Sequence, residues 1–428
     1  MLNATILYIE SSFTLVIDFV NRRHLRELKI YLLQPLMSKF LYIKLIILWA
    51  GLFITASDHA YTQDLKGNER NQTAESKKEI WKKISGYFSP PAEYKDQVGN
   101  YRSPLKFYDG EGVKTKKDWK ERRSEILMRW HELMGEWPPL LEDQRLQILD
   151  STRKDGFTQY RVSFFWTPVE RTEGYLLIPD VDPHIKMPAV ITVYYEPETA
   201  IGNGPADRDF AYRLAQRGFV TLSIGTAEAS QAKTYALYYP SLDSAKVQPL
   251  SMLGYAAANA WNVLSKVPQV DAARIGIMGH SFGGKWAMFA SCLYEKFACA
   301  VWSDPGIVFE QSRASVNYWE PWYLGYHPQP WRKRGLITED NPAFGLYPKL
   351  VSEGYDLHEL HALMAPRPFL VSGGEEDPAR RWIPLNHTVA VNKLLGVKNR
   401  VAMTNRPAHS PDKNSNELAY LFLEYFLK

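Results

Sequence analysis

The residues of clearest chemical interest lie at 279–283, where Gly-His-Ser-Phe-Gly follows a short apolar run. Ser281 stands two residues from Gly279 and two from Gly283. A sharp strand-to-helix turn needs this spacing when its central residue is strained and its flanks pass close to other backbone. Such a turn exposes the hydroxyl at a helix N-terminus, where free N–H groups can bind an oxyanion. The pattern therefore predicts a nucleophile at Ser281.

A nucleophilic serine needs a base within hydrogen-bond reach and a carboxylate that orients the base. At the turn the chain resembles the α/β-hydrolases, which order their triad as serine, acid and then histidine. Asp377, in a Gly-Gly-Glu-Glu-Asp-Pro loop after a predicted strand, is the expected acid, with Glu375 and Glu376 as alternatives. His409, in the loop after the last predicted strand, is the expected base.

The oxyanion of an acyl-transfer reaction needs two backbone N–H donors. The α/β-hydrolase resemblance assigns one to Phe282, the residue after the nucleophile, and the other to the loop after a buried strand, at Tyr195 or Glu196. His280 adjoins the nucleophile, but the turn directs it elsewhere, so we expect it to form a wall of the site.

Apolar strand patterns alternate with helix patterns over most of the chain. Continuous apolar runs such as 188–195 are typical of strands buried on both faces of a parallel sheet. The predicted strands are 158–166, 175–178, 188–195, 219–224, the run before Ser281, 298–303, 368–372 and 400–404. This order predicts an α/β fold of the α/β-hydrolase type, with a doubly wound, mostly parallel sheet.

We expect three parts: a leader at 1–60, an extension at 61–156 that packs on the body, and a catalytic domain at 157–428. In the extension, residues 116–136 place apolar side chains on one helical face. Residues 305–350 interrupt the alternation and carry many aromatic residues, which suggests a lid. Trp319 and Trp322 in this insertion are candidates for binding the apolar face of a sugar ring, and an aromatic core that holds a long loop is the alternative.

The apolar run at 45–54 follows Lys39 and Lys44 and precedes small residues, as in a signal peptide. We expect translation to start at Met37 and the mature protein to be secreted or periplasmic. A membrane anchor is the alternative, but the run is short for a membrane span.

The 428 residues carry a formal net charge of +4 without a long basic block, so composition gives no indication of a nucleic-acid or membrane partner. The histidines, including His358 and His361, show no metal-ligand spacing, and we expect neither metal nor cofactor. Cys292 and Cys299 lie in apolar surroundings and are expected to be buried free thiols, with a disulfide as the alternative.

Further stretches resemble bacterial carbohydrate esterases of the glucuronoyl esterase and acetylxylan esterase type, and more loosely dienelactone-hydrolase-like and prolyl-oligopeptidase-like hydrolases. They are Phe107-Tyr108-Asp109-Gly110, the helix with Trp119, Arg122, Arg123 and Gly135, the run from Gly174 to Pro179, Val270-Asp271, Arg274-Ile275, and the turn ending in Lys285. The resemblance implies that Lys285 contacts substrate hydroxyls. In glucuronoyl esterases an arginine follows the nucleophile, whereas Phe282 stands here. Some members take the acid from the preceding strand, which makes Asp304 the reserve acid.

The sequence thus predicts a serine esterase whose substrate is a small-molecule or polysaccharide ester, such as an acetyl or uronate ester of a polysaccharide. Two other functions stay open. One is a serine peptidase of the prolyl-oligopeptidase type, although no repeats typical of a propeller precede the hydrolase part. The other is a carbohydrate-binding scaffold with an inactive site.

Overall fold

The computed structural model describes residues 75–182 and 184–428. The chain divides into two compact units, Met1–Ser76 and Lys77–Lys428. The first unit lies almost wholly outside the described residues, as do the predicted signal peptide and the start at Met37. Among the described residues, no helix combines the length and the apolar character that crossing a membrane requires.

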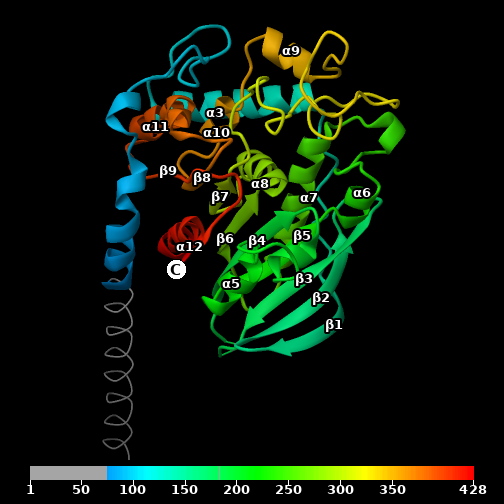
Figure 1. Cartoon of the computed structure of the whole chain (residues 1–428). Helices are drawn as coiled ribbons and strands as arrows, with labels where there is room; N and C mark the ends of the chain where they lie inside the picture. The colour runs from blue at the N-terminus through cyan, green and yellow to red at the C-terminus, as the bar shows by residue number, and fades with distance from the viewer. Residues whose placement is uncertain (1–74, 183) are drawn as a thin grey trace, which may run out of the picture. The chain divides into compact units, whose positions relative to one another are not determined.

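The second unit is built on one nine-stranded sheet with the strand order β1-β2-β3-β5-β4-β6-β7-β8-β9 (Figure 1). The strands are β1 (Gln147–Lys154), β2 (Phe157–Phe165), β3 (Arg171–Pro179), β4 (Met187–Tyr194), β5 (Val220–Gly225), β6 (Val270–His280), β7 (Cys299–Ser303), β8 (Phe369–Gly373) and β9 (Val401–Asn405). The pairs β1–β2, β2–β3 and β3–β5 are antiparallel, and the other pairs are parallel. The fold class predicted from the sequence is confirmed.

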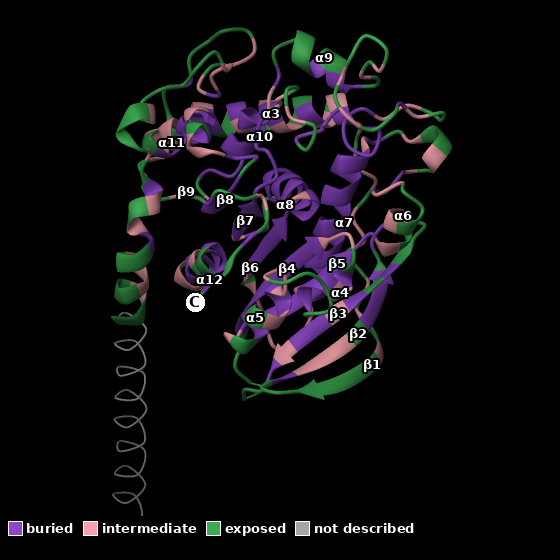
Figure 2. Cartoon of the chain, in the orientation of Figure 1, coloured by how far each residue is buried: buried purple, intermediate pink, exposed green. Residues whose placement is uncertain are grey.

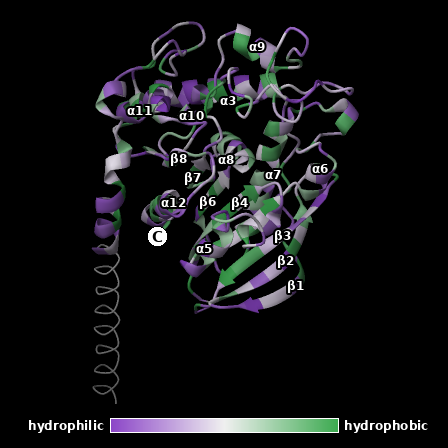
Figure 3. Ribbon diagram, in the orientation of Figure 1, coloured by the Kyte–Doolittle hydropathy of each residue, from purple (hydrophilic) through white to green (hydrophobic). Residues whose placement is uncertain are grey.

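The two ends of the sheet differ in burial. Every residue of the interior strand β5 is buried, whereas every residue of β1 is exposed except Leu149, which is half-buried (Figure 2). Figure 3 shows β1 in white and purple, because its residues are mostly hydrophilic. The sequence analysis missed β1, since a strand exposed on both faces carries no alternation of apolar and polar residues.

Helices cover both faces of the sheet, as in a doubly wound fold (Figure 1). Apolar side chains on one face, among them those of Val190 and Met278, pack against α5 (Phe210–Gln216) and α12 (Lys413–Leu427). Side chains on the other face, among them those of Ile191 and Ile277, pack in the main core with α7 (Pro249–Leu264) and α8 (Phe282–Leu293).

The described residues include further named helices and short 3₁₀ segments. They are α3 (Lys116–Met134), α4 (Pro197–Ala200), α6 (Ala227–Gln231), α9 (Tyr347–Ser352), α10 (His358–Ala362), α11 (Trp382–Leu395), and the short 3₁₀ segments η1 (Ser85–Phe88), η2 (Ala92–Tyr94), η3 (Leu242–Ser244) and η4 (Ala379–Arg381).

Helix α3 is the predicted helix of the N-terminal extension. It begins with a capping box, in which the Thr115 hydroxyl accepts from the N–H of Asp118 and the Asp118 carboxylate accepts from the N–H of Thr115. Its buried face includes Trp119, Ile126 and Trp130, as the sequence pattern predicts.

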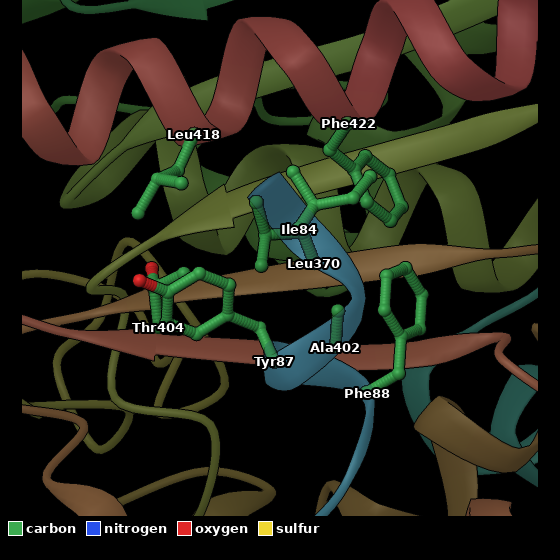
Figure 4. A pocket seen from close by; sticks show the side chains of 8 residues that line it. All are labelled: Ile84, Tyr87, Phe88, Leu370, Ala402, Thr404, Leu418 and Phe422. Atoms are coloured by element: carbon green, nitrogen blue, oxygen red, sulfur yellow. The ribbon is translucent and has the colours of Figure 1, made fainter. Parts of the chain in front are cut away.

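The segment before α3 also packs on the body, through Ile84 and Phe88. Together with Phe422 of α12 and residues of β8 and β9, these side chains line a small pocket (Figure 4). It lies on the face of the sheet covered by α12, and its lining is mainly apolar. The structure therefore anchors the start of the extension through hydrophobic contacts.

Candidate functional site

The turn between β6 and α8 holds Ser281 in a strained conformation. Its φ of 56° and ψ of −114° lie in a region that residues other than glycine rarely adopt. The Ser281 N–H donates to the Ser303 carbonyl at the end of β7, at 2.8 Å. The side chain stays half-buried, so its hydroxyl is held at the carboxyl edge of the sheet.

The two glycines that flank Ser281 are required by close backbone contacts. A Cβ at Gly279 would lie 2.1 Å from the Gly283 carbonyl oxygen, and a Cβ at Gly283 would lie 2.0 Å from the Val193 carbonyl oxygen. The sequence pattern therefore has the physical cause expected of a nucleophile elbow. The second contact also brings the start of α8 against the end of β4.

His409 lies in the loop between β9 and α12 and faces the serine. Its Nε2 is 2.8 Å from the Ser281 Oγ, a normal hydrogen-bond distance. Its Nδ1 is 2.7 Å from Oδ2 of Asp304. The structure thus joins Ser281, His409 and Asp304 in one chain of hydrogen bonds.

Asp304 is the first residue after β7 and is almost completely buried. Its Oδ1 accepts from the N–H groups of Gly374 at 2.6 Å and Asp377 at 2.9 Å, and its Oδ2 accepts from Glu376 at 3.3 Å. These three N–H donors fix the orientation of the carboxylate. A Cβ at Gly374 would lie 2.8 Å from Oδ2 of Asp304, so a larger residue there would displace the carboxylate.

Asp377 does not contact His409, which corrects the acid expected from the sequence. Its Oδ2 accepts from the N–H of Gly306 at 2.8 Å, and its Oδ1 accepts from the N–H of Ile307 at 2.7 Å. The two loops are thus joined reciprocally: each carboxylate accepts from backbone N–H groups of the loop that carries the other. The sequence shows that both loops end strands, but it does not show these reciprocal contacts.

Burial raises the pKa of Asp377 to about 6, and the nearby charge of Asp304 contributes to the rise. Arg381 and the two backbone N–H donors oppose it. The alternative acids also lie in other environments. The Glu376 carboxylate accepts from the Ser315 hydroxyl at 2.5 Å, and Glu375 is exposed.

The expected oxyanion donors lie side by side. The rings of Tyr195 and Phe282 stack with centroids 4.3 Å apart and planes inclined by 10°. Because Gly283 contacts the end of β4, the backbone at Tyr195 lies next to the first turn of α8. The role of the N–H groups of Phe282 and of Tyr195 or Glu196 stays a prediction.

Lys285 is buried rather than directed at open space. Its Nζ donates to the Pro305 carbonyl and, at 3.3 Å, to the Ser315 carbonyl. Burial lowers its pKa to about 8, against the charges of Asp377 and neighbouring carboxylates. In this structure the ammonium stabilises the loop after β7 through these two hydrogen bonds. The substrate contact implied by the resemblance stays a prediction.

The aromatic insertion forms an internal core. Trp319 is fully buried and donates its Nε1–H to the Gly335 carbonyl at 2.8 Å, so it offers no surface to a substrate. Trp322 retains 7% of its exposure. The buried Arg332 pairs with Glu320 at 3.0 Å and donates to backbone carbonyls of the same insertion. For Trp319 the structure therefore favours the alternative of an aromatic core over a sugar-binding side chain.

Two further side chains support the histidine. His280 is buried, and its ring packs 4.8 Å from that of His409, as expected of a wall. Burial and the neighbouring His409 hold the pKa of His280 well below its usual range. Arg406, which the sequence analysis missed, donates to the His409 carbonyl at 2.6 Å and to the Ser372 carbonyl at 2.8 Å. The sequence could have indicated this role, because Arg406 lies only three residues before His409 in the same loop.

No cluster of three metal-ligating side chains occurs among residues 75–182 and 184–428. The Nε2–H of His358 donates to the Arg102 carbonyl at 2.6 Å, and both ring nitrogens of the buried His361 lack a partner. Cys292 and Cys299 are buried free thiols, as predicted, and burial raises the pKa of both.

The fold is that of the α/β-hydrolases, and the hydrogen-bonded Ser281, His409 and Asp304 have the geometry of a serine-hydrolase triad. Residues 257–417 match the model of the prolyl oligopeptidase family. This range includes all three residues. No curated protein matches the sequence significantly.

Solved structures with a similar fold include several carbohydrate esterases. A glucuronoyl esterase from Solibacter usitatus has a TM-score of 0.58 and 17% identity, over 76% of this chain and 97% of that one. A promiscuous CE15 esterase from a marine bacterial metagenome has a TM-score of 0.54 and 16% identity, over 77% and 98%. A candidate acetyl xylan esterase from Bacteroides fragilis has a TM-score of 0.52 and 14% identity, over 77% and 87%. The resemblance expected from the sequence is confirmed at the level of the fold.

Proposed function

We propose that the protein is a serine esterase that cleaves carboxylic esters carried by carbohydrates. The observation that carries this proposal is the chain of two hydrogen bonds, 2.8 Å from Ser281 to His409 and 2.7 Å from His409 to Asp304. The fold shared with carbohydrate esterases supports the substrate class. The signal-peptide pattern at 45–54 supports action in the periplasm or outside the cell.

In the proposed mechanism, Nε2 of His409 takes the proton of the Ser281 hydroxyl as the oxygen attacks the ester carbonyl. The N–H groups of Phe282 and Tyr195 stabilise the oxyanion. His409 then gives the proton to the departing alcohol, which leaves an acyl-enzyme. Water activated by His409 releases the acid. Asp304 holds the imidazole in the required tautomer and stabilises its charged form.

Replacing the nucleophile tests the proposal. Ser281→Ala should lower the hydrolysis of an aryl acetate by about 10⁶-fold, to the level of the buffer control, with an unchanged circular dichroism spectrum. A fluorophosphonate should label the wild-type protein and leave Ser281→Ala unlabelled. Ser352→Ala, an exposed serine on α9, is the matched control and should retain full activity. Full activity of Ser281→Ala, or a wild-type protein that resists labelling, would contradict the proposal and favour the inactive scaffold.

The proposal also concerns which acyl group the ester carries. Phe282 replaces the arginine of glucuronoyl esterases, so the site lacks the extra cation beside the oxyanion. We therefore favour a neutral acyl group over a uronate. Hydrolysis of acetylated and methyl-uronate saccharides, compared at equal concentration, distinguishes the two.

A peptidase is the second candidate, because the matching family model is that of the prolyl oligopeptidases. The match begins at residue 257, within α7, and all named strands of the described residues belong to one sheet. The described part of the chain thus lacks a second β-structure that could restrict access to peptides. We expect a prolyl anilide to be hydrolysed at least a hundredfold more slowly than an aryl acetate, and equal rates would reverse the order of the candidates.

A further inference from the structure

An aromatic wall continues from the two oxyanion donors toward the β4–β5 side of the sheet. It begins with the stacked rings of Phe282 and Tyr195. The ring of Tyr235 lies edge-on to Tyr195, with centroids 6.1 Å apart, and lies 4.9 Å from that of Trp322. Tyr195 and Tyr235 are half-buried, unlike the buried Phe282 and Trp322.

The loop after α6 holds Tyr235 in an uncommon backbone conformation. Its φ is 62°, which is costly for an aromatic residue. The N–H groups of Thr234 and Tyr235 both donate to the Ala229 carbonyl, at 2.8 and 2.9 Å, and the Tyr238 hydroxyl donates to the Thr234 carbonyl at 2.7 Å. The surrounding contacts therefore fix the ring beside Tyr195 despite the strain.

A cation lies at the outer end of the wall. The exposed Arg334 guanidinium is 6.0 Å from the ring centroid of Trp322. Burial raises the pKa of the Tyr195 hydroxyl to about 12, and the charge of Arg334 opposes this rise. The wall thus combines two half-buried tyrosine rings with a nearby donor of hydrogen bonds, which suits an aromatic ring with polar substituents.

The strand order decides which part of an ester would meet the wall. His409 and Asp304 follow β9 and β7, on one side of β6, and Tyr195 and Tyr235 follow β4 and α6, toward β5 on the other side. The departing alcohol must take its proton from His409 and so lies on the β7–β9 side. The acyl group then extends to the β4–β5 side.

We propose that Tyr195 and Tyr235 form an acyl subsite for an aromatic ring, so that the preferred substrates are esters of aromatic acids such as cinnamic acid. The inference rests on the proposed esterase function and narrows its acyl group. The chemistry is the ordinary acyl transfer. Ser281 displaces the alcohol and forms a cinnamoyl-enzyme, and water then releases cinnamic acid.

Three esters test the subsite: methyl cinnamate, methyl acetate and benzyl acetate. The wild-type enzyme should have a kcat/KM for methyl cinnamate about tenfold to a hundredfold above that for methyl acetate, because one more ring is buried. Tyr235→Ala should remove most of this preference and leave methyl acetate within about twofold. Tyr235→Phe should retain the preference and shows whether the loop still folds. Tyr425→Ala, a half-buried tyrosine 5.2 Å from Trp81, is the matched control and should change nothing.

Equal kcat/KM values for methyl cinnamate and methyl acetate would overturn the inference, as would a Tyr235→Ala variant that loses both activities equally. A preference for benzyl acetate that depends on Tyr235 would place the ring in the alcohol and also overturn it. If Ser281 is labelled by a fluorophosphonate in these cases, the esterase proposal stands. If Ser281 resists labelling and none of the esters is hydrolysed, both proposals fail.

Discussion

Two carboxylates at the ends of adjacent parallel strands have different contacts. Asp304 follows β7 directly and binds His409, whereas Asp377 lies four residues beyond β8 and binds only backbone N–H groups and Arg381. Both are buried, and both belong to loops that the sequence marks as candidate acid loops. The difference teaches that the carboxylate nearest its strand end reaches the histidine, while the other one stabilises the loops around it.

Removing the charge of Asp304 should have the largest effect. In Asp304→Asn the imidazole loses the partner that fixes its tautomer, and kcat should fall about 10⁴-fold with little change in KM. Steady-state kinetics on an aryl acetate measure this loss. Asp377→Asn, assayed in parallel, is the matched control and should retain kcat within about tenfold. The reverse order of losses would reinstate Asp377 as the acid.

Arg406 links both strand ends to the histidine loop, since it donates to the Ser372 carbonyl, to the Ser303 hydroxyl and to the His409 carbonyl. In Arg406→Gln we expect kcat to fall about tenfold to a hundredfold with KM nearly constant, because a small displacement of a catalytic group is costly. Arg406→Lys should restore part of kcat.

Arg274→Gln is the control for Arg406. Arg274 also donates to backbone carbonyls, those of Leu427 and Lys186, but it lies near the start of β6, away from the triad. Its replacement should leave kcat unchanged. Equal kinetic effects of both substitutions would mean that Arg406 acts only on stability.

Asp377→Asn should reduce stability more than activity. An amide cannot accept from the N–H groups of Gly306 and Ile307 with both of its terminal atoms, so one buried N–H loses its partner. The free energy of unfolding should fall by about 1–3 kcal/mol, as measured by urea denaturation. An unchanged unfolding midpoint would show that the reciprocal contacts between the two loops contribute nothing to stability.

The smallest effect concerns pH. The pKa of Asp377 is raised in the folded state, so the folded protein binds more protons than the unfolded chain between about pH 4 and pH 6. The stability that this group contributes is present below about pH 4 and is lost as the pH rises through 6. Relative to Asp377→Asn, the wild type should therefore lose about 1–3 kcal/mol of unfolding free energy between pH 4 and pH 7. A constant difference would contradict the raised pKa.

The parts of the fold and site that were predicted from the sequence depend on local patterns. The elbow at Ser281, the loop of His409 and the alternation of strands and helices all follow from residues close together in the chain. The acid depends instead on contacts between loops about 70 residues apart, such as that of Asp304 with Gly374. Local patterns cannot show which of two such loops lies nearer the histidine.

Three other differences have the same origin. The burial of Trp319 depends on how the insertion folds on itself, so its composition alone suggested a binding surface. Strand β1 is defined by its pairing with β2, because its own residues are mostly exposed. The role of Arg406 depends on three separate loops and strand ends that its side chain joins.

The buried pair of Glu320 and Arg332 has a consequence for the approach of a polymer. Opening the insertion would separate these charges from each other and from the carbonyls that Arg332 binds, which is expensive in a buried setting. The insertion is therefore held closed. With the polysaccharide substrate of the proposed function, an insertion that stays closed would admit only esters that project from the main chain.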